Sequence, residues 1–214
     1  MNVKLISVTE PVRCQEDSPK NAEELVAYCA RVSNPTNQNN TETAPRLIKY
    51  LIKHKHWSPF ELASMCVEIK TSRAIAAQIL RHRSFSFQEF SQRYSKATEL
   101  EDLELRAPAE KNRQSSSEPF PEDSDAYKYA KISMESSLAT YKTLIDMGVA
   151  KECARAILPL NTETTMYMNG TLRSWVHYID LRAAEDTQKE HRDIANAIKD
   201  IFVQKFPNIS EALE

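Results

Sequence analysis

Apolar residues recur along this chain at two different spacings, and each spacing predicts a different kind of element. Alternation of apolar and polar residues is typical of strands that bury one face. In the segment 62–70 this alternation would place Met65, Val67 and Ile69 on one side. Together with two further runs of apolar and β-branched residues, the pattern predicts strands at 3–12, 62–70 and 162–169.

Apolar residues spaced three and four apart predict helices over most of the remaining chain. In 18–33 the apolar stripe follows Ser18 and Asn21, either of which can cap a helix. Gly148 is suited to end one helix and Thr171 to begin another. The further segments expected to be helical are 44–56, 72–83, 125–148, 151–159, 171–186 and 187–206. We therefore expect a helix-dominated α+β (α/β) fold, a single domain over 1–214 with a small central antiparallel or mixed sheet.

Two segments fit neither spacing cleanly. The segment 84–95 has alternating phenylalanines and is interpreted as a strand or an ordered loop. The segment 108–124 is rich in proline, serine and charge and almost free of aliphatic residues. We interpret it as a surface excursion and not as a domain linker, because neither flank looks complete alone.

Composition narrows the class of protein. The 214 residues include 28 Lys and Arg against 30 Asp and Glu, so the formal net charge is −2, and 41% are hydrophobic. Disorder needs fewer apolar residues, and bulk nucleic-acid binding usually shows a basic excess, so we expect neither. No apolar run approaches the roughly 18 residues of a membrane span. The start of the chain lacks the signal-peptide pattern, and we expect a cytoplasmic protein, whether of a cell or of a virus in its host.

The four cysteines are far apart in the sequence and form no CxxC pair. In a chain of this length they are typical of reduced cytosolic thiols. Cys29, Cys66 and Cys153 lie in apolar, periodic contexts, so we expect buried and inert side chains, while Cys14 precedes the first expected helix. None of them is expected to be a nucleophile.

Glycine is the most informative count, because the chain has only two. Dinucleotide-binding loops and phosphate-binding loops both require glycines that this chain lacks. Any phosphate must therefore be held by side chains and helix N-termini. Arginine is the leading candidate, since its planar fork can pair with two oxygens at once.

Cations cluster at the end of the helix expected over 72–83, in Arg81, His82 and Arg83. The simplest interpretation is that they stabilise a helix C-terminus. At about 100° per residue, Gln78, Arg81 and His82 would share a face and Arg83 would point elsewhere. Such a helix end could hold two separate anionic groups.

The residues that follow interleave polar and aromatic side chains. The phenylalanines suit a core, whereas hydroxyls, amides and arginines packed this closely also suit the phosphate, sugar and base of a nucleotide. Glu89 would meet a hydroxyl, an N–H group or an arginine sooner than a phosphate. The polar members are Ser84, Ser86, Gln88, Glu89, Ser91, Gln92 and Arg93, and the aromatic members are Phe85, Phe87 and Phe90.

The helix expected after Gly170 carries two arginines nearly opposite each other, Arg173 and Arg182. His177 is four residues from Arg173 and shares its face, and Trp175 and Tyr178 suit a core. The arginines are either solvent-exposed or, if buried, in need of anionic or polar partners.

Other kinds of site find little support. A zinc site from His54, His56 and His82 fails because the first two do not share a helical face and no further ligand has metal-site spacing. A serine hydrolase of the GxSxG type lacks its motif. We expect no metal.

The segment RHRSFSFQEFSQRYS at 81–95 resembles the signature of the flavin-dependent thymidylate synthases. That signature places a glutamate, a serine and an Arg-Tyr pair after RHR, here Glu89, Ser91 and Arg93-Tyr94. The segments 29–35, 56–61, 152–164 and 172–182 resemble other family motifs in the family's order.

The resemblance implies the family's α/β fold and its activity in dTMP biosynthesis. Members are flavoproteins and methyltransferases that make dTMP from dUMP. They use 5,10-methylenetetrahydrofolate as carbon donor and FAD, usually reduced by NADPH, as hydride source, and they need no enzyme cysteine nucleophile. They are homotetramers whose active sites are shared between subunits.

The resemblance also implies site residues. FAD would be bound by Ser58 of a neighbouring subunit and by Arg81, His82, Arg83, Glu89, Thr171, Leu172, Arg173 and His177. The dUMP would be bound by Gln78, Ile79, Leu80, Arg81, Glu89, Phe90, Ser91, Gln92, Arg93, Arg155 and Arg182. Arg182 would be catalytic, polarising the uracil and favouring ionisation at N3. Stabilising negative charge that develops during the reaction is the kind of binding that accelerates it.

Two rival functions stay open. A catalytically idle relative would still bind nucleotide or flavin, and loss of a signature residue would favour it. A nucleic-acid-binding module built on the RHR cluster would show salt-sensitive affinity for oligonucleotides.

Overall fold

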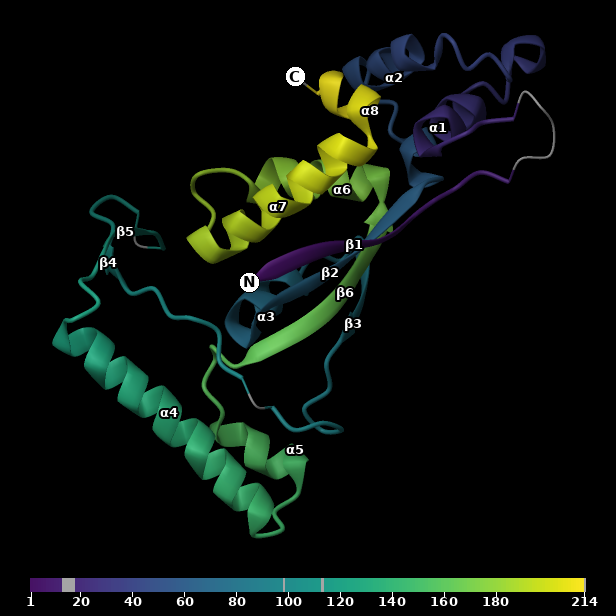
Figure 1. The fold of residues 1–214 in the computed structure, drawn as a ribbon. Coiled ribbons are helices and arrows are strands. Elements are labelled where there is room, and N and C mark those ends of the chain that lie inside the picture. Colours follow the sequence, from purple (N-terminus) through teal and green to yellow (C-terminus); the bar gives the residue numbers. More distant parts are fainter. Residues whose placement is uncertain (13–17, 98, 113, 214) are drawn as a thin grey trace.

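A four-stranded antiparallel sheet lies at the centre of the computed structural model, which describes residues 1–12, 18–97, 99–112 and 114–213. Three strands match segments where strands were predicted, and the fourth lies in the segment interpreted as strand or loop. The strand order across the sheet is β1 (Asn2–Val8), β2 (Ser64–Ser72), β6 (Glu163–Thr171) and β3 (Phe85–Glu89) (Figure 1).

The predicted apolar face of the sheet is confirmed. Met65, Val67 and Ile69 of β2 are fully buried and alternate with partly exposed residues. In the antiparallel register Val67 is opposite Met168 and Ile69 is opposite Met166, and both methionines are fully buried too. The same alternation therefore lines the core from both central strands.

One glycine of β6 is required by close packing. Gly170 pairs with Phe85 of β3 and with Met65 of β2. A Cβ atom at position 170 would lie only 2.4 Å from the Phe85 ring. The ring thus occupies the space that any side chain would need.

Helices cover one face and one end of the sheet (Figure 1). Trp175 and Phe202 are buried within this layer, and the Trp175 indole N–H donates to the Met65 carbonyl at 2.9 Å. The helices are α3 (Arg73–Ile79), α6 (Leu172–Arg182) and α7 (Lys189–Lys205), with α1 (Ala22–Ala30), α2 (Ala44–Lys53) and α8 (Pro207–Glu211) towards the end near the C-terminus.

Predicted caps are found at several helix ends. The Asn21 side chain accepts from the Glu24 N–H at 2.9 Å, and Thr171 accepts from the Ser174 N–H at 3.3 Å. Gly148 has the positive φ of 89° that suits the residue after a helix. Local sequence chemistry therefore sets these boundaries.

Several helices are shorter than predicted, among them α1, α5 (Lys151–Ala154) and α6. The helix expected over 44–56 ends at Lys53, and Lys55 adopts a left-handed φ of 57°. The helix expected over 72–83 ends at Ile79, so the RHR cluster lies in a turn and not on a helical face. Helix α3 stops because β3 begins at Phe85 and must pair with β6. The chain leaves the helix to reach that pairing.

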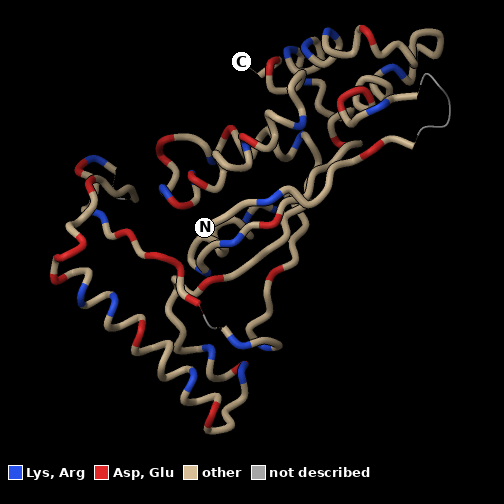
Figure 2. Tube along the Cα trace, in the orientation of Figure 1, with Lys and Arg blue, Asp and Glu red and all other residues tan. Residues whose placement is uncertain are grey.

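The segment from about 99 to 157 forms an arm beside the sheet, with α4 (Asp125–Asp146) as its longest element (Figure 1). Most of the predicted excursion 108–124 is exposed, but it also contributes to a two-stranded ribbon. Figure 2 shows Lys and Arg mixed with Asp and Glu along α4. The remaining elements are β4 (Arg106–Pro108), β5 (Ser116–Pro119), α5 (Lys151–Ala154) and the 3-10 turn η3 (Arg155–Ile157).

The cysteine prediction is partly wrong. Cys29 and Cys66 are half-buried, and burial raises the pKa of both thiols, as expected for inert groups. Cys153 is exposed, because the short helix α5 buries only Ala154. Cys14 lies outside the described residues. Among the helices of the described segments, none combines the length and apolarity that a membrane crossing requires.

Candidate active site

Polar side chains from three helices meet His82 of the RHR segment, which lies in a turn. We call Gln78, His82, Tyr178, Arg182 and His191 the central polar cluster. Tyr178 is 2% exposed and His191 is fully buried, although both carry polar groups. The Tyr178 hydroxyl lies 3.1 Å from His191 Nε2, and His191 Nδ1 lies 3.3 Å from Gln78 Oε1.

Arg182 and the RHR segment come together although they are 100 residues apart in the sequence. Arg182 Nε donates to His82 Nε2 at 2.9 Å, so this imidazole nitrogen is unprotonated. Burial, together with the charges of Arg182 and Arg81, lowers the pKa of His82. A neutral histidine therefore holds the Arg182 side chain without cancelling its positive charge.

The cations of the RHR segment have no carboxylate partner within the described chain. Arg81 and Arg83 are exposed, and the described ion pairs include neither of them. Unpaired guanidinium groups next to a nearly glycine-free framework fit an anionic ligand such as a diphosphate. On this donor chemistry, the residues present fit FAD.

Glu89 is held by the protein itself. Its Oε1 accepts from Arg73 Nη1 at 2.6 Å and from the Thr164 hydroxyl at 3.0 Å. This agrees with the expectation that Glu89 meets an arginine or a hydroxyl. Arg73, which opens α3, was not foreseen as its partner.

The segment after β3 contributes an amide and another arginine. Gln92 is 6% exposed, and its Nε2 is buried without a hydrogen-bond partner among the described residues. Arg93 Nε donates to Glu152 Oε2 at 3.2 Å, and both side chains are exposed. Arg155 opens η3, three residues beyond Glu152. These groups lie at the junction of the sheet and the arm.

The expected FAD-binding residues Thr171, Leu172, Arg173 and His177 lie at the end of β6 and on α6. Ser174 Oγ donates to the Ser84 carbonyl at 3.3 Å, which brings the start of α6 against the RHR segment. The Arg173 guanidinium pairs with Glu61, and the His177 ring lies 4.9 Å from the Trp57 ring, centroid to centroid.

The expected binding residues differ in how accessible they are in the single chain. Ile79 and Leu172 are fully buried in the core, whereas Leu80 is 39% and Phe90 is 37% exposed. Ser58, at the start of the 3-10 turn η2 (Ser58–Glu61), is exposed and makes no described contact with the central polar cluster. The structure thus joins Gln78, His82 and Arg182, but not Ser58 or Arg155.

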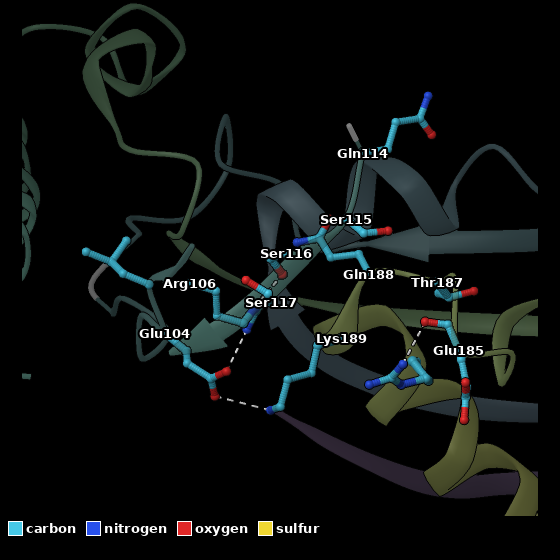
Figure 3. A pocket seen from close by; sticks show the side chains of 12 residues that line it. Glu104, Arg106, Gln114, Ser115, Ser116, Ser117, Glu185, Thr187, Gln188 and Lys189 are labelled. Carbon is cyan, nitrogen blue, oxygen red and sulfur yellow. Dashed lines mark hydrogen bonds and ion pairs between the residues drawn. The ribbon is translucent and has the colours of Figure 1, made fainter. Parts of the chain in front are cut away.

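Several polar residues at the start of α7 belong to none of the recognised motifs. Gln188 Oε1 accepts from Gln78 Nε2 at 2.6 Å. Gln188 also lines a cavity of about 360 Å³, between α7 and the β4–β5 ribbon, to which Arg192 contributes (Figure 3). Arg192 donates to the Glu185 carbonyl at 2.8 Å and, like Arg182, has no carboxylate partner among the described ion pairs. A positive charge in the first turns of a helix interacts unfavourably with the helix dipole. This position could have marked Arg192 as a candidate functional residue from the sequence.

Relatives of this chain carry one common name. A family model described as "Thymidylate synthase complementing protein" matches residues 16–208. A protein of Paramecium bursaria Chlorella virus 1, named "Probable flavin-dependent thymidylate synthase", is 53% identical over 100% of this chain and 99% of its own. The chain belongs to the flavin-dependent thymidylate synthase family.

Further members of the flavin-dependent thymidylate synthase family show how widely the likeness extends. The Synechocystis protein is 50% identical over the whole of both chains, and the Thermus thermophilus protein is 34% identical over 88% of this chain and 70% of its own. The resemblance seen in the RHR signature is therefore confirmed.

A solved structure supports the fold. The UMP/dUMP methylase PolB of Streptomyces cacaoi, bound with 5-Br dUMP, superposes with a TM-score of 0.80 at 24% identity. The match covers 99% of this chain and 93% of that one. At this identity, the likeness establishes the common architecture of the two chains.

Proposed function

We propose that this chain is a flavin-dependent thymidylate synthase that converts dUMP to dTMP. The carbon donor is 5,10-methylenetetrahydrofolate, and NADPH reduces the bound FAD. The observation that carries the proposal is the contact between Arg182 and His82, which joins the last family motif to the RHR signature. Relatives of that name at 50–53% identity over the full chain support it.

The flavin would be held by cations and polar groups in place of a glycine loop. Arg81 and Arg83 suit its diphosphate, and His82 and Glu89 suit its polar edges. Bound FAD supplies the hydride that the methyl group needs. The remaining proposed contacts are Thr171, the Leu172 backbone, Arg173, His177 and Ser58 of a neighbouring subunit.

The nucleotide would be held from both sides of the central polar cluster. Arg93, Arg155 and the unpartnered Gln92 amide suit its phosphate and hydroxyl groups, and the Gln78 amide presents a donor. The exposed residues Leu80, Phe90 and Ser91 would line the same site, and the buried Ile79 is the remaining proposed contact.

Arg182 is the proposed catalytic residue. Its Nε donates to His82, and no hydrogen bond among the described residues uses its two terminal nitrogens, so both can donate to ligand oxygens. Because His82 is neutral, the full guanidinium charge can stabilise negative charge that develops on uracil. The ion pairs of the described residues do not include Arg182, so none of the described carboxylates pairs with that charge.

The proposal is tested by product formation. Protein reconstituted with FAD should release tritium from dUMP tritiated at C5 and form dTMP, only when methylenetetrahydrofolate and a reductant are present. FAD uptake without dTMP formation would favour the catalytically idle relative. Failure to bind FAD, together with salt-sensitive oligonucleotide binding, would favour the nucleic-acid-binding module.

The role of Arg182 is tested by comparing two arginines. Arg182→Ala should reduce dTMP formation at least about a hundredfold while FAD stays bound, as for the loss of one charge-stabilising donor. Arg192→Ala is the matched variant, since Arg192 also lacks a carboxylate partner among the described ion pairs but does not contact His82. Full activity in Arg182→Ala with loss in Arg192→Ala would transfer the base-facing role to Arg192.

The proposed assembly is a cytoplasmic homotetramer in which Ser58 reaches the flavin of another copy. Supporting this, Ser58 is exposed and makes no described contact with the central polar cluster of its own chain. Light scattering gives the mass. Mixing Ser58→Ala subunits with Arg81→Ala subunits should restore part of the activity if sites are shared.

A further inference from the structure

We propose that His191 is a positioning residue that fixes the orientation of the Gln78 amide, so that its NH2 group faces the nucleotide. This inference rests on the proposed function, because it takes Gln78 to contact dUMP. It concerns a residue outside every recognised motif. Burying a histidine without hydrogen-bond partners for its ring nitrogens costs free energy, and His191 has a partner at both nitrogens.

A chain of hydrogen bonds determines, for the amide side chains of Gln188 and Gln78, whether the oxygen or the NH2 group faces each neighbour. Glu190 is an ionised carboxylate that only accepts, and it accepts from Arg106 Nη2 at 2.6 Å. Burial opposes this ionisation, but hydrogen bonds from its own backbone, Arg106 and Gln188 outweigh burial and lower the pKa of Glu190. Gln188 must therefore direct its NH2 group at Glu190, 2.9 Å away.

The next two links follow by elimination. With its NH2 group on Glu190, Gln188 turns its carbonyl oxygen to Gln78, which must donate through Nε2 at 2.6 Å. Gln78 then directs its own oxygen at His191 Nδ1, 3.3 Å away. His191 consequently carries its proton on Nδ1, and its Nε2 accepts from the Tyr178 hydroxyl.

His191 is built to stay in this one form. Burial, with the charges of Arg182 and His82, lowers its pKa to about 4, so the ring is neutral at physiological pH. Burial raises the pKa of Tyr178, so its hydroxyl keeps the proton that it donates. In the tautomer set by this chain of hydrogen bonds, the Gln78 oxygen faces the Nδ1–H donor, and a flipped Gln78 amide would place two donors against each other.

The consequence for binding is a fixed donor. Within the chain, the Gln78 NH2 group donates to the Gln188 oxygen. A carbonyl or phosphate oxygen of the nucleotide would take that place, whereas a ligand donor group would meet another donor. His191 would thus act on dUMP through Gln78 without touching it.

Two amide substitutions separate positioning from simple packing. In His191→Asn the shorter amide would place its NH2 group near the position of the histidine Nδ1, so this variant keeps the donor to Gln78 and leaves Tyr178 unpaired. In His191→Gln the longer amide would lie near the position of the histidine Nε2, so this variant keeps Tyr178 paired and leaves Gln78 without a donor. Each variant therefore loses one hydrogen bond of the same kind.

The measurement is KM for dUMP, with the dUMP dissociation constant, FAD affinity and melting temperature recorded alongside. We expect KM to rise about tenfold in His191→Gln and to stay within about threefold in His191→Asn. FAD affinity should be unchanged in both, and the two melting temperatures should fall similarly. Tyr178→Phe, which leaves the Gln78 contact in place, should behave like His191→Asn.

The outcomes separate this inference from the proposed function. If the wild type makes dTMP but both histidine variants change KM equally, or neither changes it, His191 is a packing residue and the inference falls. If neither variant folds, Gln188→Ala and Tyr178→Phe carry the test: Gln188→Ala should lower the dUMP dissociation constant severalfold, and no change in it would overturn the inference. A wild type that makes no dTMP contradicts the proposed function itself.

Discussion

The helix layer on the sheet and the arm along α4 use helices in opposite ways. α6 has 11 residues and buries four of them, including Trp175 and Tyr178, whereas α4 has 22 residues and buries only Tyr141. Apart from His82, the residues of the central polar cluster lie on the helices that pack against the sheet. The comparison teaches that the residues needing a fixed geometry are set in the tightest part of the core, where side chains have little freedom.

The arm is attached to the body largely through polar contacts. The Tyr141 hydroxyl accepts from the Ala97 N–H at 3.3 Å, and Arg106 Nη2 donates to Glu190 Oε1 of α7 at 2.6 Å. Regions with few buried apolar contacts open locally at lower free energy than the core does. The arm should therefore open before the sheet unfolds.

The largest expected effect is on the body. Trp175→Ala removes a fully buried indole and its hydrogen bond to the Met65 carbonyl. We expect the free energy of unfolding to fall by about 3–5 kcal/mol, measured by urea denaturation. A loss below about 1 kcal/mol would show that α6 is not held by this packing.

The next effect is a pH dependence confined to the body. The folded-state pKa of His191, about 4, lies below its unfolded value, so its stabilising contribution is complete above pH 6.5 and is lost as pH falls from 6.5 towards 4. Over that window the free energy of unfolding should fall by up to about 3 kcal/mol.

The His191→Asn variant isolates this effect, because His82 shifts in the same direction. Urea midpoints recorded at intervals between pH 7 and pH 4.5 should fall less steeply in the variant. Glu104 and Glu190 have lowered pKa values in the folded protein, so their contribution to the free energy of unfolding is lost only below pH 4.5. Equal slopes in the two proteins would contradict a neutral buried His191.

A smaller effect is expected at the attachment of the arm. Tyr141→Phe leaves the buried Ala97 N–H without its partner, at a cost of about 1–2 kcal/mol. Hydrogen exchange should quicken in α4 while amides of β2 and β6 keep their protection. Equal acceleration in both regions would mean that arm and body unfold as one unit.

The smallest effect is expected on the outer face of α4. Ile132 is 63% exposed, so Ile132→Ala should change the stability of the single chain by less than about 0.5 kcal/mol. Ile69→Ala in β2, which is fully buried, should cost about 2–5 kcal/mol and serves as the matched variant. A dependence of the Ile132→Ala effect on protein concentration would show that another copy covers this face.

The body was largely predictable from the sequence because its signals are local. Alternation identified the buried side of β2, and single residues such as Asn21 and Thr171 identified helix starts. The end of α3 was not predictable in this way, since it depends on the pairing of β3 with a strand about eighty residues later.

The sequence named candidate site residues but not their geometry. The family resemblance implied Gln78, His82 and Arg182, yet the contacts that bring them together join positions 100 residues apart or more. His191 was missed because a polar residue in an amphipathic helix is ordinarily assigned to solvent. Only the packing of α7 against α3 and α6 buries it.

The glycine at position 170 ties strand pairing to the chemistry of the cluster. The Phe85 ring that lies over Gly170 also contacts the rings of Trp175 and Tyr178, at centroid distances of 4.6 and 5.7 Å. A single methyl group added to the backbone there would drive this ring toward both aromatic neighbours, and through Tyr178 toward His191. A substitution of Gly170 by alanine would thus disturb the Tyr178–His191 hydrogen bond as well as the pairing of the strands.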